Sequence, residues 1–281
     1  MTRVTLVGAA GKMGGRVRGS LRSDNDYELS LVEADPAGRE RLRAEGWTVA
    51  DPDTAYADAD LVVLAVPDAV VGDVAEDVVP RLKAGAILVC LDPAGAYAER
   101  LPRREDISCF ITHPTHPPQF ELLKEHDPRA RDDYWGGGLA QQSLVNALVW
   151  GEESAYERGE ALARRVFRPV LRSHRLTLEQ MVLLEPAMAE TVGITCCVVI
   201  KEAMDEAIRR GVPADAASDF MLGHVQLGLA LVYEMLDWKL SAGAEQAVTD
   251  AMKILLQPDW KRVFDLDEVR GSVNRITGAT A

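Results

Sequence analysis

The sequence has few cysteines, and their spacing does not suggest pairing. Cys90, Cys109, Cys196 and Cys197 are the four thiols in 281 residues, and the last two are adjacent in an apolar run. There is no CxxC spacing and no disulfide framework. This pattern indicates a protein of a reducing compartment.

A surplus of basic residues is also missing. The chain has 31 Lys and Arg against 44 Asp and Glu, which gives a formal net charge of −13. Nothing is left over to replace counterions on a phosphate backbone, so nucleic acid and anionic membrane surfaces are excluded as expected partners. A small anionic substrate stays compatible, because one pocket needs only a few local cations or a helix N-terminus.

Long hydrophobic runs are lacking as well. No uninterrupted apolar stretch approaches the roughly 20 residues that cross a bilayer. The opening residues "RVTLVGAAGKMGG" have neither the apolar segment nor the small-residue cleavage site of a secretory signal. We therefore expect a cytoplasmic location.

The first part of the chain alternates β-branched runs with amphipathic, Ala-rich runs. This alternation predicts an α/β fold, a Rossmann-like doubly wound parallel sheet with crossover helices. The central runs are apolar throughout, as strands buried on both faces should be. The expected strands are 4–7, 29–33, 61–66, 87–91 and 108–112, and the apolar runs 144–150 and 170–174 could extend the same sheet.

Strand signals nearly stop after Arg175, and helical patterns follow over 177–210, 214–234 and 244–256. We predict two domains: a nicotinamide-dinucleotide-binding domain, 1–176, and an all-α helical domain, 177–281, for substrate binding and dimerisation. Thr177 and Gln180 form a predicted capping box, and Pro186 should kink the first helix. The long apolar helices have more hydrophobic surface than a small domain hides, which predicts a homodimer.

The segment "VTLVGAAGKMGG" places three glycines, Gly8, Gly11 and Gly14, between a strand and a helix. Such a loop brings backbone amides close to a pyrophosphate, and Glu33, 19 residues after Gly14, stands where a ribose diol would be held. An acid there repels a 2′-phosphate, so NAD is favoured over NADP, although Arg39 moderates this preference. The predicted cofactor-binding loop residues are Gly8, Ala10, Gly11, Lys12, Met13 and Gly14.

A second marker is the run "LVVLAVPD", in which a buried strand ends at Val66, Pro67 and Asp68. The carboxyl edge of a parallel sheet is where ligands bind, so these three residues are expected to flank the nicotinamide. An ordinary strand end is the alternative. About the first 115 residues resemble the N-terminal domain of 6-phosphogluconate dehydrogenase, prephenate dehydrogenase and ketol-acid reductoisomerase, which implies an NAD(P)-binding oxidoreductase.

The segment "CFITHPTHPPQF" brings His113 and His116 to the same edge. Histidine can take the proton that accompanies hydride transfer. His113 resembles the His of a His-Pro pair that acts on the substrate hydroxyl in prephenate dehydrogenases, which implies a catalytic His113. We expect His116, at the same edge, to bind substrate. The two histidines could instead bind a metal, or be turn residues fixed by Pro114 and Pro117.

Three carboxylates follow in "RLTLEQMVLLEPAMAETVGITC". On a regular α-helix Glu179 and Glu190 lie within about 20° of each other and roughly 16 Å apart, whereas Glu185 points away. "LTLEQMVL" resembles the metal-binding helix of ketol-acid reductoisomerases, which implies a divalent cation such as magnesium at Glu179. The acid expected one turn earlier is replaced by Arg175, and all three glutamates could simply be solvated.

A second resemblance concerns Glu190. The stretch "ETVGITCCVVIKEAMDEAIRRGVP" resembles the core helix of β-hydroxyacid dehydrogenases, and Glu190 falls near their catalytic lysine, which this chain lacks. The resemblance implies a catalytic role for Glu190. His224, alone in an apolar helix, is either a satisfied core residue or a substrate contact.

Nearly the whole chain resembles a bacterial group with a 6-phosphogluconate-dehydrogenase-type C-terminal domain, which includes the D-apionate oxidoisomerases. The segments "THPTHPP", "QQSLVNALVWG" and "LTLEQMVLLEPAMAETVGITC" carry this resemblance. It implies NAD-dependent oxidation of a branched sugar acid coupled to a carbon shift. A simple hydroxyacid or alcohol dehydrogenase and a non-catalytic nucleotide sensor are the alternatives.

Overall fold

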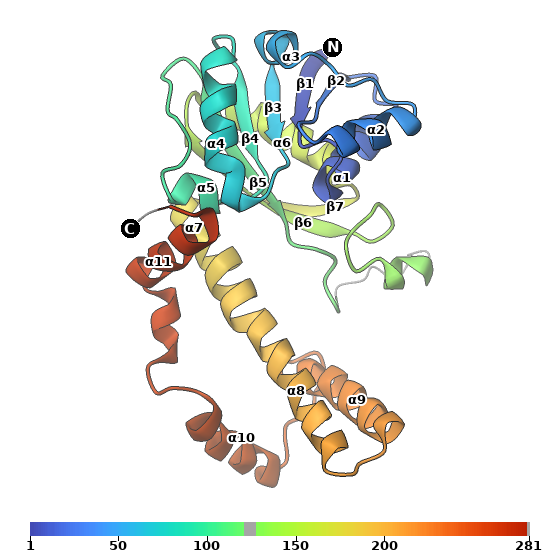
Figure 1. The fold of residues 1–281 in the computed structure, drawn as a ribbon. Helices are drawn as coiled ribbons and strands as arrows, with labels where there is room; N and C mark the ends of the chain where they lie inside the picture. Colours follow the sequence, from blue (N-terminus) through green and yellow to red (C-terminus); the bar gives the residue numbers. More distant parts are fainter. Residues whose placement is uncertain (121–127, 280–281) are drawn as a thin grey trace. The chain divides into compact units, whose positions relative to one another are not determined.

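The computed structural model describes residues 1–120 and 128–279. Its centre is a seven-stranded sheet with the order β2-β1-β3-β4-β5-β6-β7 (Figure 1). The strands are Thr2–Val7 (β1), Tyr27–Val32 (β2), Leu61–Leu64 (β3), Ile87–Cys90 (β4), Ser108–Pro114 (β5), Gln142–Trp150 (β6) and Val170–Arg175 (β7). The predicted α/β class is confirmed, and both late apolar runs join the same sheet.

The first five strands are parallel, but β6 runs antiparallel to β5, and β7 runs parallel to β6. The carboxyl ends of β1 to β5 therefore share one edge of the sheet. In the register of the last three strands, His113 pairs with Val145 and Val145 pairs with His174. β7 ends at Arg175, one residue after His174, so the chain leaves β7 near the carboxyl end of β5.

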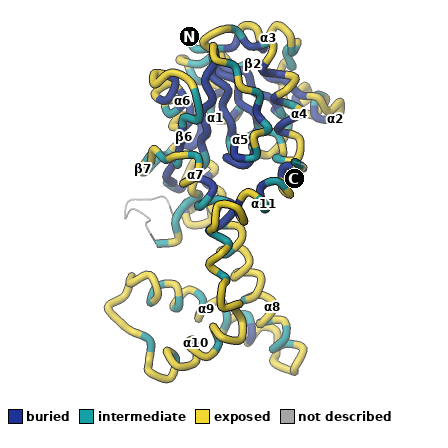
Figure 2. Tube along the Cα trace, turned by 90° about the vertical axis from the view of Figure 1, so that its left-hand side faces the viewer, coloured by how far each residue is buried: buried dark blue, intermediate teal, exposed yellow. Residues whose placement is uncertain are grey.

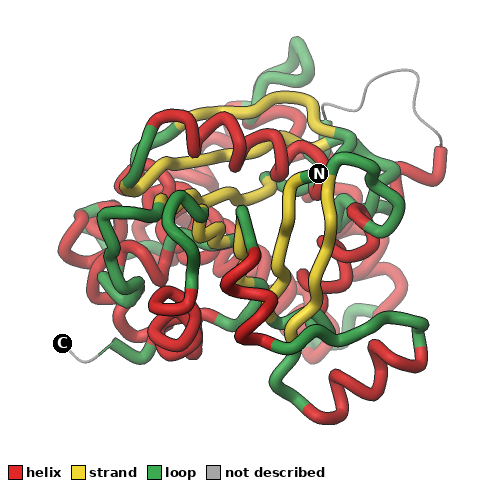
Figure 3. The backbone as a smooth tube through the Cα atoms, turned by 90° about the horizontal axis from the view of Figure 1, so that it is seen from above, coloured by secondary structure: helices red, strands yellow, loops and turns green. Residues whose placement is uncertain are grey.

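Helices cover both faces of the sheet (Figure 3). Buried residues of α1, α2 and α6 pack on one face, and those of α3, α4, α5 and α7 pack on the other. The helices of this part are Lys12–Leu21 (α1), Pro36–Ala44 (α2), Pro52–Asp58 (α3), Asp68–Val78 (α4), Ala94–Tyr97 (α5), Glu153–Val166 (α6), Leu178–Val182 (α7) and Leu266–Thr277 (α11), with short 3₁₀ turns at Val79–Arg81 and Pro128–Asp132.

The starts of several helices follow from local chemistry. Asp35 accepts hydrogen bonds from Ala37 and Gly38 ahead of α2, and Asp51 caps α3 through the amide of Thr54. Both caps precede a proline, which suits the first helical position because its missing N–H has no helical partner. The predicted capping box of Thr177 and Gln180 is confirmed.

Successive side chains along each central strand belong to two different apolar clusters, one on each face of the sheet. Along β3, Val62 and Leu64 join one cluster, and Leu61 and Val63 join the other. All four are at most 2% exposed. Each such side chain contributes about 1.5–3 kcal/mol through burial, so the sheet is held from both faces and its loops can carry a site.

The helix expected over 177–210 has a different interior. After α7, residues Leu183–Ile194 form a π-helix that contains Pro186, and α8, Thr195–Arg209, continues from it. Proline has no N–H for the ladder and crowds the carbonyl of the preceding turn, and a wider turn relieves this. Thr191 Oγ1 donates to the Pro186 carbonyl at 2.6 Å. Side-chain positions counted at 100° per residue therefore fail in this segment.

The chain divides into two compact units, 1–185 with 269–281, and 186–268. The second unit contains α8, α9 (Ala214–Val232), α10 (Ala242–Leu255) and a 3₁₀ helix, Trp260–Phe264. This division differs from the predicted boundary after residue 176 because α7 packs on the sheet and α11 buries Val269 and Val273 in the first unit. The roles assigned to the two predicted domains stay predictions.

One helical stretch, Leu178–Arg209, is long and apolar enough to cross a membrane by length and composition alone. Glu185 and Glu190 lie within it. A single stretch of this kind is weak evidence, because core helices of soluble proteins pass the same test.

Candidate functional site

The glycine loop after β1 has the close packing that its motif predicts. Gly8 has a φ of +77°, and a Cβ at this position would lie 2.5 Å from the Ala65 carbonyl oxygen. A Cβ on Gly14 would lie 2.3 Å from the Gly8 carbonyl oxygen. Helix α1 begins directly after Gly11, which offers no side chain as a cap. Its first amides therefore remain available to an anion, as a dinucleotide loop requires.

Glu33, just beyond β2, lies against this loop. Its Oε2 accepts a hydrogen bond from the Ala10 amide at 2.8 Å, and its Oε1 accepts one from the Asp35 amide at 3.0 Å. Arg39 Nε donates to the Glu33 carbonyl oxygen. The structure thus brings the predicted ribose ligand and the predicted phosphate loop together, and it places a guanidinium beside them.

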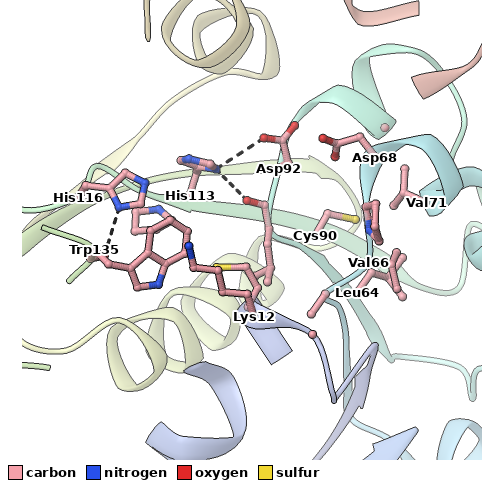
Figure 4. A pocket seen from close by; sticks show the side chains of 17 residues that line it. Lys12, Leu64, Val66, Asp68, Val71, Cys90, Asp92, His113, His116 and Trp135 are labelled. Carbon is pink, nitrogen blue, oxygen red and sulfur yellow. Dashed lines mark hydrogen bonds and ion pairs between the residues drawn. The ribbon is translucent and has the colours of Figure 1, made fainter. Parts of the chain in front are cut away.

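A pocket of about 360 Å³ opens where the parallel strands end (Figure 4). Its wall combines the glycine loop, the segment that follows β3, the end of β4 and the segment that follows β5. Predicted site residues from the glycine loop, from the end of β3 and from the end of β5 share it. The residues that line it include Gly11, Lys12, Met13, Val66, Pro67, Asp68, Cys90, Asp92, His113, His116 and Trp135.

His113 is held at the end of β5 with a defined orientation. Its Nδ1 lies 2.9 Å from the Leu91 carbonyl oxygen, and because a carbonyl only accepts, Nδ1 carries the proton in this bond. The other nitrogen, Nε2, then has its lone pair free when the ring is neutral. Nε2 lies 3.5 Å from Glu185 Oε2, and Nδ1 lies 3.7 Å from Asp92 Oδ2.

Asp68, in the first turn of α4, is the carboxyl group with the largest change among these residues. Burial, together with the negative charges of Asp92 and Glu185, raises the pKa of Asp68 to about 6, and His113 opposes the rise. Asp92 is itself oriented by the Ala94 amide, which donates to its Oδ1 at 2.8 Å. The pocket therefore combines an imidazole with a group that can carry a proton near neutral pH.

His116 and Trp135 form the opposite wall. His116 Nδ1 donates to the Trp135 carbonyl oxygen at 3.2 Å, and the two rings are 4.9 Å apart. Burial lowers the pKa of His116, which favours the neutral ring. The Lys12 ammonium lies 4.1 Å from the centre of the Trp135 ring. Figure 4 shows Lys12 and Trp135 on one side of the pocket and Asp68 on the other.

Family models match both parts of the chain. The family model of the acetohydroxy acid isomeroreductase NADPH-binding domain matches residues 6–122. The model of the C-terminal domain of phosphogluconate dehydrogenase (decarboxylating) matches residues 123–277. The resemblance predicted from the motifs is therefore confirmed in both parts of the chain.

Relatives match over nearly the full length. A D-apionate oxidoisomerase of Cupriavidus necator is 42% identical over 276 residues, which cover 98% of this chain and 99% of the relative. One of Rhizobium rhizogenes is 42% identical over 99% of this chain and 100% of the relative. The chain belongs to the D-apionate oxidoisomerase family.

A crystal structure from Cupriavidus necator, described as a semialdehyde dehydrogenase NAD-binding protein in complex with calcium and NAD, superposes with a TM-score of 0.94. It is 41% identical and covers 99% of this chain and 100% of its own. This chain is thus an enzyme of the D-apionate oxidoisomerase family, an oxidoreductase with an NAD-binding fold.

Of the residues predicted to act on substrate or metal, Glu179, Glu190 and His224 do not line this pocket. Glu179, in α7, is exposed beside a different hollow that also includes Arg175 and Arg270. Glu190 and His224 are exposed residues of the second unit. His224 Nδ1 donates to the Phe220 carbonyl oxygen at 2.8 Å, and the two rings stack. His224 is therefore not a buried core residue in this chain.

Sequence reasoning missed Asp92, Trp135 and the position of Glu185. Asp92 follows β4 as His113 follows β5, so the rule that parallel strands end at one edge could have found it. Glu185 gave no such signal, because its position depends on a π-helix that starts two residues earlier. Trp135 lies between the 3₁₀ turn at Pro128–Asp132 and β6, where the sequence predicted no strand or helix.

The residues differ in how well they fit the ligands that this family implies. The glycine cradle, the free start of α1 and the placement of Glu33 fit a dinucleotide. For a divalent cation, residues 1–120 and 128–279 contain no group of three or more His, Cys, Asp or Glu side chains arranged to hold one. Glu179 is exposed and does not form such a group, so no step is assigned to a metal here.

Proposed function

We propose that this chain catalyses the NAD-dependent oxidation of a small polyhydroxylated acid, D-apionate, with a coupled isomerisation. The observation that carries the proposal is His113, whose Nε2 lone pair is free in the pocket that the glycine loop also lines. The names of the two relatives at 42% identity support the substrate. The NAD-bound structural relative supports the cofactor.

In this proposal the chain's residues divide the work of alcohol oxidation. NAD, when bound, supplies the acceptor for the hydride that leaves the carbinol carbon. The substrate hydroxyl gives its proton to His113 Nε2, while Leu91 holds the opposite nitrogen. The neutral His116 can accept a hydrogen bond from a second substrate hydroxyl through its own Nε2.

NAD is the preferred cofactor in this proposal. The carboxylate of Glu33 stands beside the loop, where it would repel a 2′-phosphate and accept hydrogen bonds from a ribose diol. The guanidinium of Arg39 also lies beside Glu33 and keeps NADP in competition. Titrating the protein with each nucleotide in a calorimeter measures this preference, and equal affinities would overturn it.

The reaction is tested by following NADH absorbance with D-apionate. His113→Asn should lower kcat at least about a hundredfold, as expected on losing a general base, and should leave NAD affinity within about twofold of wild type. His174→Asn, an exposed histidine of β7, is the matched control and should behave as wild type. Full turnover by His113→Asn would remove this residue from the mechanism.

Product analysis separates the alternatives. A proton NMR spectrum of the product shows whether the carbon skeleton has shifted, and an unshifted oxidised acid would indicate a simple dehydrogenase. Binding of NAD without turnover across a panel of sugar acids would indicate a nucleotide sensor. Because the structural relative contains calcium, each assay is run with and without a chelator. Turnover that survives chelation agrees with the absence of a metal step.

We also propose that the chain is a homodimer formed through its second unit. All of this unit is described, and only Pro186, Ala187 and Ala217 are buried in it. Most of its residues are exposed instead (Figure 2). The exposed large apolar side chains include Phe220, Val232, Trp238, Ile254 and Leu255. A helical unit with so small a core needs a partner, and a second copy supplies the same apolar surface in return.

A cytoplasmic location remains part of the proposal.

A further inference from the structure

The ring of His113 lies between two carboxylates that come from different elements. Asp92, at the end of β4, faces Nδ1 at 3.7 Å, and Glu185, at the start of the π-helix, faces Nε2 at 3.5 Å. We propose that Glu185 is a positioning residue that stabilises the protonated ring of His113 during oxidation. This inference rests on the proposed function, in which His113 is the base.

The two carboxylates are not equivalent, because the two nitrogens have different roles. Nδ1 already donates its proton to the Leu91 carbonyl oxygen at 2.9 Å, and Asp92 is committed in part to the Ala94 amide. Nε2 is the nitrogen on which a substrate proton arrives. Glu185 is the carboxylate beside that nitrogen, so it meets the new positive charge directly.

The surroundings make this charge pair effective. The side chain of His113 is 19% exposed and that of Glu185 is 26% exposed. Water screens a pair of this kind less than it screens an ion pair on the open surface. Without Glu185, the positive charge of the protonated ring would face Asp92, which lies on the Nδ1 side.

The proton and electron changes balance with no bond formed to Glu185. The O–H bond of the substrate breaks, its proton joins Nε2, and the carbinol hydride with its electron pair goes to the nicotinamide. The imidazolium then returns its proton to water after the product leaves. Asp68 on α4 and His116 after β5 are titratable groups that also act on this cluster.

Substitution of Glu185 tests the inference. Glu185→Gln should lower kcat about tenfold to a hundredfold while the substrate KM and NAD affinity stay within about twofold. The acid limb of kcat/KM should move to lower pH by about one unit, because an imidazolium without its counterion loses its proton more easily. Glu185→Asp keeps the charge at a greater distance and should lie between wild type and Glu185→Gln in both respects.

Two controls separate this role from a structural one. Glu76→Gln, at an exposed carboxylate of α4, should keep the wild-type rate and pH profile. Nitrogen NMR on the five histidines, with His113 assigned by His113→Asn, should show the same Nδ1–H tautomer in wild type and Glu185→Gln. A changed tautomer would mean that Glu185 orients the ring instead of stabilising its charge, and would overturn the inference.

An acid limb at the wild-type position in Glu185→Gln would also overturn it. If circular dichroism shows that Glu185→Gln is unfolded, Glu185→Asp carries the test, and an unshifted limb in that variant overturns the inference equally. Failure of the inference differs from failure of the proposed function. If His113→Asn loses turnover but the acid limb of Glu185→Gln is unshifted, only the role of Glu185 is rejected. If His113→Asn keeps full turnover, the role of His113 as the base is rejected.

Discussion

At the scale of single residues, Asp68 shows how the pocket affects stability. Burial raises its pKa from 3.8 to about 6. The folded chain therefore binds this proton more tightly than the unfolded chain does, and the buried carboxylate lowers stability at any pH above about 6. The loss shrinks as the pH falls from 6 towards 3.8 and disappears below that range.

Asp68→Asn should therefore raise the free energy of unfolding by about 1 kcal/mol at pH 8. A shift of two pKa units corresponds to about 3 kcal/mol, and partial exposure and the favourable start of α4 reduce this value. Urea unfolding at pH 8 and at pH 3.5 measures the effect, which should vanish at the lower pH. Glu76→Gln on the same helix serves as the control, and equal stability of Asp68→Asn and wild type at pH 8 would contradict the prediction.

Much of the candidate site could be predicted from residues alone. Gly8, Gly14 and Glu33 have local signals, because a strand, a tight turn and an acid at the end of the next strand occur at fixed spacing. The structure brings them together as expected. His113 and Asp68 follow from the rule for parallel strands. Glu185 does not, because its approach to His113 depends on the helix geometry after α7.

At the scale of elements, the strands were predictable and the direction of the last two was not. Buried parallel strands read as continuous apolar runs, which is how β3 and β4 appear in the sequence. The run of β6 is apolar too, and nothing in it indicates that it runs antiparallel to β5. The direction of β6 depends on the edge at which the chain after β5 returns to the sheet, and no local sequence pattern predicts that edge.

The contact between α6 and β5 gives an element-scale prediction. Gly159 in α6 lies against Phe110 of β5, and a Cβ at this glycine would lie 2.5 Å from the ring. Phe110 is fully buried and cannot move aside. Gly159→Ala should therefore destabilise the chain by about 2 kcal/mol, seen as a fall in Tm of roughly 4–8 °C.

Gly19→Ala is the matched control for that helix contact. Gly19 lies in α1, and a Cβ there would have no atom within 4 Å. This variant should be neutral or more stable by up to about 1 kcal/mol, because alanine restricts the unfolded chain. If both variants behave alike in thermal melts, the close packing of α6 on Phe110 does not limit stability.

At the scale of the whole molecule, the exposed apolar surface of the second unit gives a prediction about assembly. The purified chain should have twice the mass of one chain in light scattering after size-exclusion chromatography. Ile254, which is 82% exposed, and its neighbour Leu255 are suitable sites to disrupt the contact. Changing both to Glu should shift the mass towards one chain, because two buried charges without partners oppose association.

Val70→Lys, at an exposed apolar residue of α4, is the control for a change of surface charge and should stay dimeric. A wild-type protein that is monomeric at micromolar concentration would contradict the dimer. The apolar composition of 214–234 and 244–256 indicated this surface from the sequence. The sequence did not indicate that the unit would keep so few side chains buried within itself.

The return of α11 to the first unit has a consequence for synthesis in the cell. Val269 and Val273 are buried among residues translated much earlier, and Arg270 Nη1 donates to the Tyr97 carbonyl oxygen at 3.1 Å. The dinucleotide-binding part is thus discontinuous along the chain. A nascent chain on the ribosome cannot complete this part until residues 269–277 have emerged, so its folding ends only after the second unit has been translated.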